Sequence, residues 1–140
     1  MGDVSMPSAT VQKIIDTLEL QRHPEGGWYR ETWRDTPSDG SRGHGTAIYF
    51  LLEEGPGSLR HRVDATEIWH YYAGDPVELT IEAEDGNVRR ELLGGDLASG
   101  ERPQGIVPKD AWQSARSTGA WSLVGCTVSP AFEFSGFELS

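Results

Sequence analysis

The sequence predicts an all-β domain, a sandwich or a closed barrel, with one short helix near its start. About eight to ten short segments of strand composition are separated by turn signals, which is typical of these folds. Seventeen glycines and eight prolines supply the turns, while five tryptophans, four tyrosines and four phenylalanines require a packed core. No strands alternate with long helices, which argues against a doubly wound parallel sheet.

The helix is predicted from an apolar stripe formed by Val11, Ile14, Ile15 and Leu18. These residues follow the i, i+3, i+4, i+7 spacing of one helix face, and Ser8 or Thr10 is the expected N-cap. So short a helix is marginal alone, and we expect its stripe to pack on a sheet. Residues 1–10 are expected to be a disordered tail, and residues 11–140 a single domain.

The strands are predicted from alternating or continuous apolar runs bounded by Gly, Pro, Asn and Asp. Asp85-Gly86 is a two-residue hairpin signal, and residues 35–45 read as an exposed loop. The run from Thr46 to Leu52 is apolar enough to be buried on both faces. Strands are expected at residues 28–34, 46–52, 67–72, 77–83, 88–93, 104–107, 121–128 and, with a glycine break, 132–139.

The charge and the single cysteine exclude several classes of protein. A formal net charge of -10 argues against a nucleic-acid partner, because a phosphate backbone needs a basic face. The chain has no 18-residue apolar run and no basic-then-apolar leader, so neither a membrane partner nor export is expected, and the predicted location is the cytoplasm. Cys126 alone forms neither an intramolecular disulfide nor a Cys-rich zinc site, and we expect a buried, inert thiol.

The stretch from Gly57 to Gly74 contains the main candidate site residues, His61 and Glu67. If they lie on two adjacent antiparallel strands, their side chains share one face at the mouth of a barrel. An imidazole and a carboxylate so placed ligate a divalent metal or act as a base and its orienting partner. The alternative is a buried hydrogen bond that only satisfies two polar groups.

Strand periodicity places Trp69 and Tyr71 on the same face as Glu67, and His70 on the opposite face. Two aromatic rings beside a carboxylate form a wall for a flat or sugar-like ligand, or are ordinary core. His70 is then a packing or interface residue.

Further polar residues are candidates for ligand binding. Glu25, Arg30 and Glu31 follow or flank the paired glycines of His23-Pro-Glu-Gly-Gly, where the alternative is a plain turn with surface ion pairs. Gln104, Trp112 and Gln113 combine amides with an aromatic ring and suit the orientation of a ligand, although Gln113 also fits an exposed loop. Trp33 is a further possible wall residue.

The Gly57–Gly74 stretch resembles the first motif of the cupin superfamily, with His61, Glu67 and Gly74 at three of its positions. Val63 replaces the second usual histidine, and Gln113 falls where the last one stands. Blocks similar to those of the cupin 5 (DUF985) family run in order through about residues 11 to 139: His23–Glu31, Thr46–Leu52, Glu67–Pro76, Val107-Pro108 and Leu123–Pro130. The resemblance implies a double-stranded β-helix, the RmlC-like jelly roll, that usually dimerises.

The resemblance leaves three functions open. In the first, the barrel binds a sugar, nucleotide or small acid without a tightly held metal and acts as an isomerase or epimerase, with His61 as general base and Tyr71 or Glu67 as its proton-relay partner. In the second, a divalent metal lies among His61, Glu67 and Gln113, with His23 or His44 as a further ligand, and supports oxygenase or isomerase chemistry. In the third, the protein binds or stores a ligand without catalysis.

Overall fold

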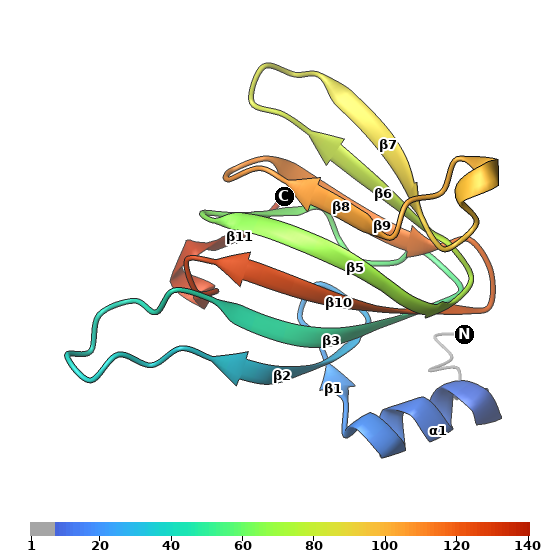
Figure 1. Cartoon of the computed structure of the whole chain (residues 1–140), viewed down its shortest axis with the longest axis horizontal. Coiled ribbons are helices and arrows are strands. Elements are labelled where there is room, and N and C mark those ends of the chain that lie inside the picture. Colours follow the sequence, from blue (N-terminus) through green and yellow to red (C-terminus); the bar gives the residue numbers. More distant parts are fainter. Residues whose placement is uncertain (1–7) are drawn as a thin grey trace.

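The computed structural model describes residues 8–140, which form two antiparallel sheets packed face to face (Figure 1). The six-stranded sheet has the order β1-β2-β3-β10-β5-β8, and the five-stranded sheet the order β11-β4-β9-β6-β7. The elements are α1 (Ala9–Leu18), β1 (Gln21–Arg22), β2 (Trp28–Arg34), β3 (Thr46–Glu53), β4 (His61–Val63), β5 (Thr66–Gly74), β6 (Val77–Glu82), β7 (Val88–Leu93), η1 (Leu97–Ser99), β8 (Gln104–Val107), β9 (Trp112–Ser117), β10 (Trp121–Ser129), η2 (Phe134–Gly136) and β11 (Phe137–Leu139).

The all-β class with one N-terminal helix is therefore confirmed, and most strands lie where the sequence predicts them. Two predictions are wrong. Residues 112–117, where no strand is predicted and Gln113 fits an exposed loop, form β9 between β4 and β6. Residues 132–139 form only the short strand β11, preceded by the single turn η2. The inward-facing residues of β9 are Gln113, Ala115 and Ser117, which are small or polar and give no apolar alternation.

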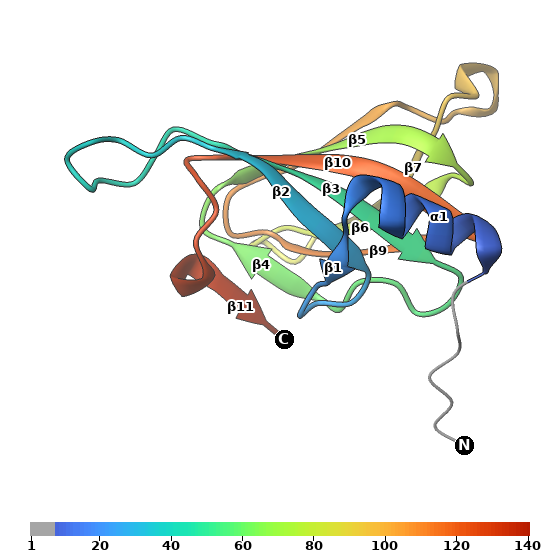
Figure 2. The same cartoon turned by 90° about the horizontal axis from the view of Figure 1, so that it is seen from below.

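The helix α1 lies along the outer side of the six-stranded sheet (Figure 2). Its buried residues Val11 and Ile15 pack against Leu51 of β3, while Phe50 and Leu52 of the same strand face the interior between the sheets. The prediction that this strand is buried on both faces is thereby confirmed. The helix begins at Ala9, so the ordered domain starts before residue 11; residues 1–7 lie outside the described part of the chain.

Ser8 is the N-cap of α1, and its hydroxyl oxygen accepts a hydrogen bond from the backbone N–H of Val11 at 3.2 Å. Replacing Ser8 by alanine leaves that donor without its partner, and we expect the free energy of unfolding to fall by about 1 kcal/mol. Urea denaturation of both proteins measures the difference. Glycine at the same position is the control, because it caps almost as well as serine, and an equal loss in both variants would contradict the capping role.

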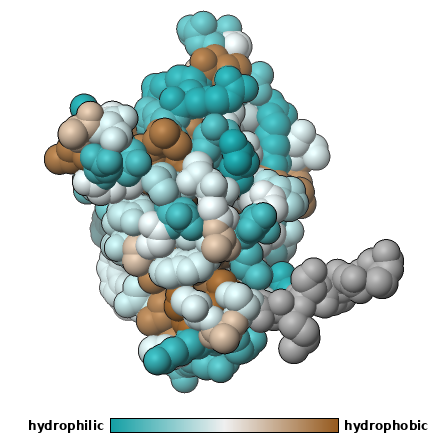
Figure 3. Space-filling model, turned by 90° about the vertical axis from the view of Figure 1, so that its right-hand side faces the viewer, coloured by the Kyte–Doolittle hydropathy of each residue, from teal (hydrophilic) through white to brown (hydrophobic). Residues whose placement is uncertain are grey.

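The main apolar core fills the space between the two sheets around Trp69, with Phe50, Leu79, Leu93 and Val124 among its buried residues. Outside, hydrophilic residues predominate on the face seen in Figure 3, and apolar ones form separate small patches, which fits the high charge of the chain. Among residues 8–140 no helix is both long and apolar enough to span a membrane.

Candidate functional site

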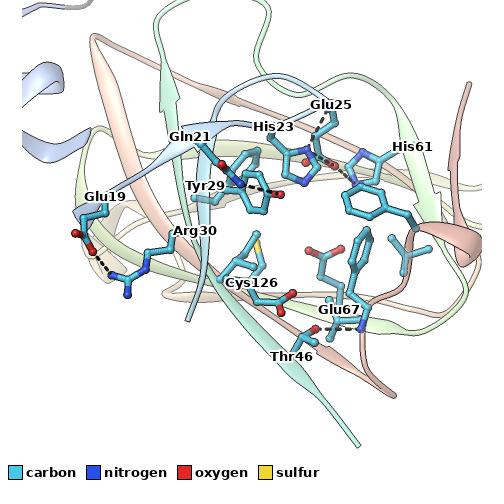
Figure 4. A pocket seen from close by; sticks show the side chains of 17 residues that line it. Glu19, Gln21, His23, Glu25, Tyr29, Arg30, Thr46, His61, Glu67 and Cys126 are labelled. Carbon is cyan, nitrogen blue, oxygen red and sulfur yellow. Dashed lines mark hydrogen bonds and ion pairs between the residues drawn. The ribbon is translucent and has the colours of Figure 1, made fainter. Parts of the chain in front are cut away.

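A cavity of about 430 Å³ opens beside the apolar core, between the six-stranded sheet and β4 (Figure 4). Strands β2, β3, β5 and β10 contribute its walls on one side, and β4 and the segment before β11 contribute the other. Both His61 and Glu67 line it, as the sequence predicts, but not from neighbouring strands. Because β4 and β5 belong to different sheets, these side chains face each other across the barrel.

Glu25 reaches the cavity because the turn after β1 folds inward. The backbone N–H of Gly26 donates to the carbonyl of His23, and both Gly26 and Gly27 have positive φ angles of 100° and 82°. A Cβ on Gly27 would meet Phe50 and the carbonyl of Leu51 within 3 Å, so only glycine allows this close approach. The turn therefore places the carboxyl of Glu25 among buried groups, where it is 6% exposed.

A single proton lies between Nε2 of His61 and the carboxyl of Glu25. The Nδ1 of His61 lies 2.8 Å from the carbonyl oxygen of Leu59, which only accepts, so Nδ1 carries a hydrogen. The opposite nitrogen, Nε2, lies 3.2 Å from Oε2 of Glu25. Burial lowers the pKa of His61, while burial and then the nearby Glu67 raise the pKa of Glu25 well above its usual value. The pair is therefore neutral, with Glu25 protonated and donating to Nε2.

His23 lies beside this pair and is also neutral. Its Nδ1 accepts a hydrogen bond from the backbone N–H of Glu25 at 3.0 Å, and its ring packs edge-on against Tyr29 with 4.5 Å between centroids. Burial, and secondarily His61, lower the pKa of His23 to about 4. The residue acts as an uncharged wall of the cavity that holds the Glu25 turn in place.

Glu67 is held by a chain of two hydrogen bonds from the core. The indole N–H of Trp69 donates to Oε1 of Gln113 at 2.9 Å, and the amide nitrogen of Gln113 donates to Oε1 of Glu67 at 2.9 Å. Because an indole N–H only donates, the orientation of the Gln113 amide is fixed. Burial raises the pKa of Glu67 to about 7, against the opposing effect of hydrogen bonds from Gln113 and the Cys126 thiol.

The predicted metal-ligand set of His61, Glu67 and Gln113 does not fit a divalent cation. The only Gln113 atom suited to ligation is its carbonyl oxygen, which is turned toward Trp69, and the amide nitrogen faces Glu67. In the part of the chain that the structure describes, no three or more His, Cys, Asp or Glu side chains are arranged to hold a metal. His23 lies at the cavity without completing such a set, and His44 is exposed and does not line it.

Among the other predicted ligand-binding residues, Glu25, Arg30 and Glu31 line the cavity. The latter two stand at its exposed mouth, where Arg30 lies 3.3 Å from Glu19 and Glu31 lies 2.8 Å from Arg34.

The remaining predicted residues lie elsewhere, which corrects the prediction for each. Trp69 is fully buried in the core, and Tyr71 packs at the far side of that core, with its hydroxyl donating to the carbonyl of Gly74. Tyr71 is therefore not next to His61. The residues that lie outside the cavity on exposed or outer faces are Trp33, Gln104 and Trp112, the last beneath the guanidinium groups of Arg60 and Arg62.

Sequence reasoning missed three kinds of wall residue. Cys126 is buried, as predicted, but its thiol also lines the cavity, and burial followed by Glu67 raises its pKa well above the usual value. Thr46 lines the wall and accepts a hydrogen bond from the backbone N–H of Phe132. Phe132 and Phe134 close the side next to β11, and their only sequence signal is the aromatic spacing after Pro130.

Two antiparallel sheets around a buried polar cluster in the barrel mouth define a jelly-roll protein of the cupin type. The chain belongs to the cupin superfamily (DUF985) family, which it matches over residues 12–140. The predicted family and fold are thereby confirmed.

Similar proteins cover nearly the whole chain. Protein SO0799 of Shewanella oneidensis is 42% identical, with a TM-score of 0.87 over 96% of this chain and 85% of that one. A hypothetical protein of Leishmania major is 33% identical, with a TM-score of 0.84 over 92% and 86%. The uncharacterized protein YML079W of Saccharomyces cerevisiae is 24% identical over 91% of this chain and 74% of its own.

Proposed function

We propose that the protein binds a small organic molecule inside the barrel, with the molecule enclosed between the aromatic walls and the buried Glu25, His61 and Glu67. The observation that carries the proposal is the cavity of about 430 Å³, because its size lies within the range of small-molecule sites and its polar groups converge at one place. Burial of these polar groups costs free energy that a well-packed core avoids, which supports a role in binding.

The test is a thermal-stabilisation screen of sugars, nucleosides, amines and small acids, followed by calorimetry of any compound that stabilises the protein. A ligand at 100 times its Kd should add about 2.7 kcal/mol to the free energy of unfolding. Ile48 lines the cavity, and replacing it by tryptophan should fill the space and abolish the stabilisation. Ile106 lies outside the cavity and is 52% exposed, so the same replacement there is the matched control. Equal binding by both variants would contradict the proposed site.

Proton-transfer catalysis of the isomerase type is a second candidate, supported by the pKa of Glu67 near 7. A base tuned to neutral pH suits removal of a proton beside a carbonyl, and the protonated Glu25 suits donation to the carbonyl oxygen. His61 has both nitrogens engaged, so in this scheme it positions Glu25 instead of acting as the base. With an α-hydroxy carbonyl compound, Glu67 returns its proton to the former carbonyl carbon, and the original α-hydroxyl gives its proton to Glu25 and becomes the new carbonyl, which completes the isomerisation.

The catalytic candidate predicts that a bound carbonyl compound exchanges its α-hydrogen with D₂O faster than in buffer. Glu67→Gln should reduce this exchange at least about a hundredfold, since general base catalysis typically contributes that much. Glu78→Gln, at the surface beside Arg116, is the matched control and should retain it. Mass spectrometry measures the deuterium gained. Exchange that persists in Glu67→Gln would exclude Glu67 as the base.

A further inference from the structure

We infer that the ligand of this cavity is a nitrogen base, an organic amine or protonated nitrogen heterocycle, that binds as a cation with its N–H groups on the Glu67 carboxylate. The inference rests on the proposed binding function and names the ligand class for the same cavity. Its basis is the juxtaposition of buried carboxyls, aromatic walls and a lining in which the described residues offer no unpaired cation.

The lining offers no free cation to an anionic ligand. Four glutamates line the cavity, namely Glu19, Glu25, Glu31 and Glu67, and of these Glu25 is protonated and Glu31 is paired with Arg34, while Arg30 is the single guanidinium of the lining. Arg30 lies at the exposed mouth, 3.3 Å from Glu19, and is therefore already paired. The two histidines of the lining are neutral. A phosphate or carboxylate that entered would be buried without a cationic partner, which costs more than binding returns.

Glu67 presents an oxygen that the protein leaves open to a ligand. Its carboxyl points into the cavity (Figure 4), and the residue as a whole is 7% exposed. Gln113 donates to Oε1, and the Cys126 thiol is a weak donor to the same carboxyl, but among residues 8–140 no N–H or O–H group donates to Oε2. Because Trp69 fixes the Gln113 amide, this acceptor has a set position. An ammonium or a protonated ring nitrogen supplies a strong N–H donor to this oxygen, and a charge-assisted hydrogen bond is about twice as strong as a neutral one.

The walls around Glu67 suit a cation as well. Tyr29, Phe50, Phe132 and Phe134 line the same cavity. The faces of aromatic rings are electron-rich and attract a cation within about 6 Å of the ring centre, most strongly when water is excluded. A neutral alcohol of the same shape gains the apolar contact without this attraction. Aromatic faces and a buried carboxylate together therefore select for positive charge.

Binding of a cation should be coupled to loss of a proton from Glu67. Glu25 and Cys126 face Glu67 and stay protonated, since the pKa of each is raised well above its usual value. His23 and His61 stay neutral because burial lowers the pKa of each. Glu67, with a pKa of about 7, is the group that ionises near neutral pH. The affinity for a permanently protonated amine should therefore rise about tenfold from pH 6 to pH 8.

The test compares benzylamine, benzyl alcohol and benzoate, which share one ring and differ in charge, by titration calorimetry on the full-length protein. Benzylamine should bind at least about tenfold more tightly than the alcohol, a difference that one charge-assisted hydrogen bond supplies, and benzoate should bind most weakly. At pH 6, titrations in two buffers of different ionisation enthalpy should show release of nearly one proton, which disappears by pH 8.5. Glu67→Gln should reduce the amine preference to within about twofold, whereas Glu78→Gln should retain it.

The outcomes separate this inference from the function on which it rests. Alcohol or benzoate binding as tightly as the amine, or amine affinity independent of pH, would overturn the cationic ligand and leave the binding cavity in place. Failure of all three probes, and of every compound in the thermal screen, would overturn both proposals. The comparison of charges and the pH dependence use the unmodified protein, so they decide the matter even where Glu67→Gln folds poorly.

Discussion

Replacing Trp69 by alanine is expected to lower the free energy of unfolding by about 5 kcal/mol. Trp69 is fully buried at the centre of the barrel, and truncation of a buried tryptophan alone costs roughly 3–5 kcal/mol. The change also removes the N–H that Oε1 of Gln113 accepts, and a buried polar group without its partner costs about 1–3 kcal/mol more. Small domains have only about 5–15 kcal/mol in total, so urea denaturation should show a protein close to unfolding.

Trp69→Phe separates the packing of this residue from its hydrogen bond. Phenylalanine retains most of the ring packing against Phe50 but has no N–H, so we expect a loss that is smaller than that of alanine but still above about 1 kcal/mol. Trp33→Ala is the matched control, since Trp33 is 54% exposed and its loss should cost little. A Trp69→Phe protein as stable as the unmodified one would show that the chain from Trp69 through Gln113 to Glu67 contributes nothing.

The sequence predicts those parts of the fold in which the spacing of apolar residues matches the buried face of a helix or strand. The stripe of α1 and the apolar run of β3 are buried against each other, and both are visible as patterns. The hydrophobic pattern does not predict β9, because its inward-facing residue Gln113 is polar. The hydrogen bonds of this amide are made within the core. The short connection around Asp64 carries no signal that the chain passes from one sheet to the other between His61 and Glu67.

The site follows from the sequence only in part. Glu25 is predicted for ligand binding from its glycine turn, but its pairing with His61 depends on the fold bringing that turn against the residues before β4. The two-residue alternation of the strand correctly predicts that Tyr71 shares the inward face with Glu67. Trp69 fills the barrel between them, so Tyr71 lies beyond the indole and away from the cavity. The alternation of a strand predicts the face on which a side chain lies. Whether that side chain reaches the cavity or packs into the core depends on the neighbouring side chains.

Glu67→Gln is expected to make the protein more stable at neutral pH, by an amount that depends on pH. The unfolded chain loses the Glu67 proton near pH 4.5, whereas the folded protein holds it until about pH 7. The unfolded state therefore binds fewer protons in this window, and the Glu67 contribution to stability falls by about 3 kcal/mol as the pH rises through it. Glutamine does not ionise, and its oxygen still accepts from Gln113. The stability gained on replacing Glu67 should thus grow by about 3 kcal/mol from pH 4.5 to pH 7.5.

The measurement must be a difference between variants, because His23 acts in the opposite direction. Its pKa is about 4 in the folded protein and 6.5 in the unfolded chain, so its contribution rises with pH between these values and masks that of Glu67 in the unmodified protein. Urea denaturation of both proteins at pH 4.5, 6 and 7.5 cancels the His23 effect. Glu78→Gln, at the surface beside Arg116, is the control, because a surface ion pair contributes little to stability. A constant difference for Glu67→Gln would mean that Glu67 ionises normally in the fold. A buried carboxyl that lowers stability at neutral pH, and whose replacement by glutamine restores that stability, is typical of a binding site and not of a core that serves only for packing.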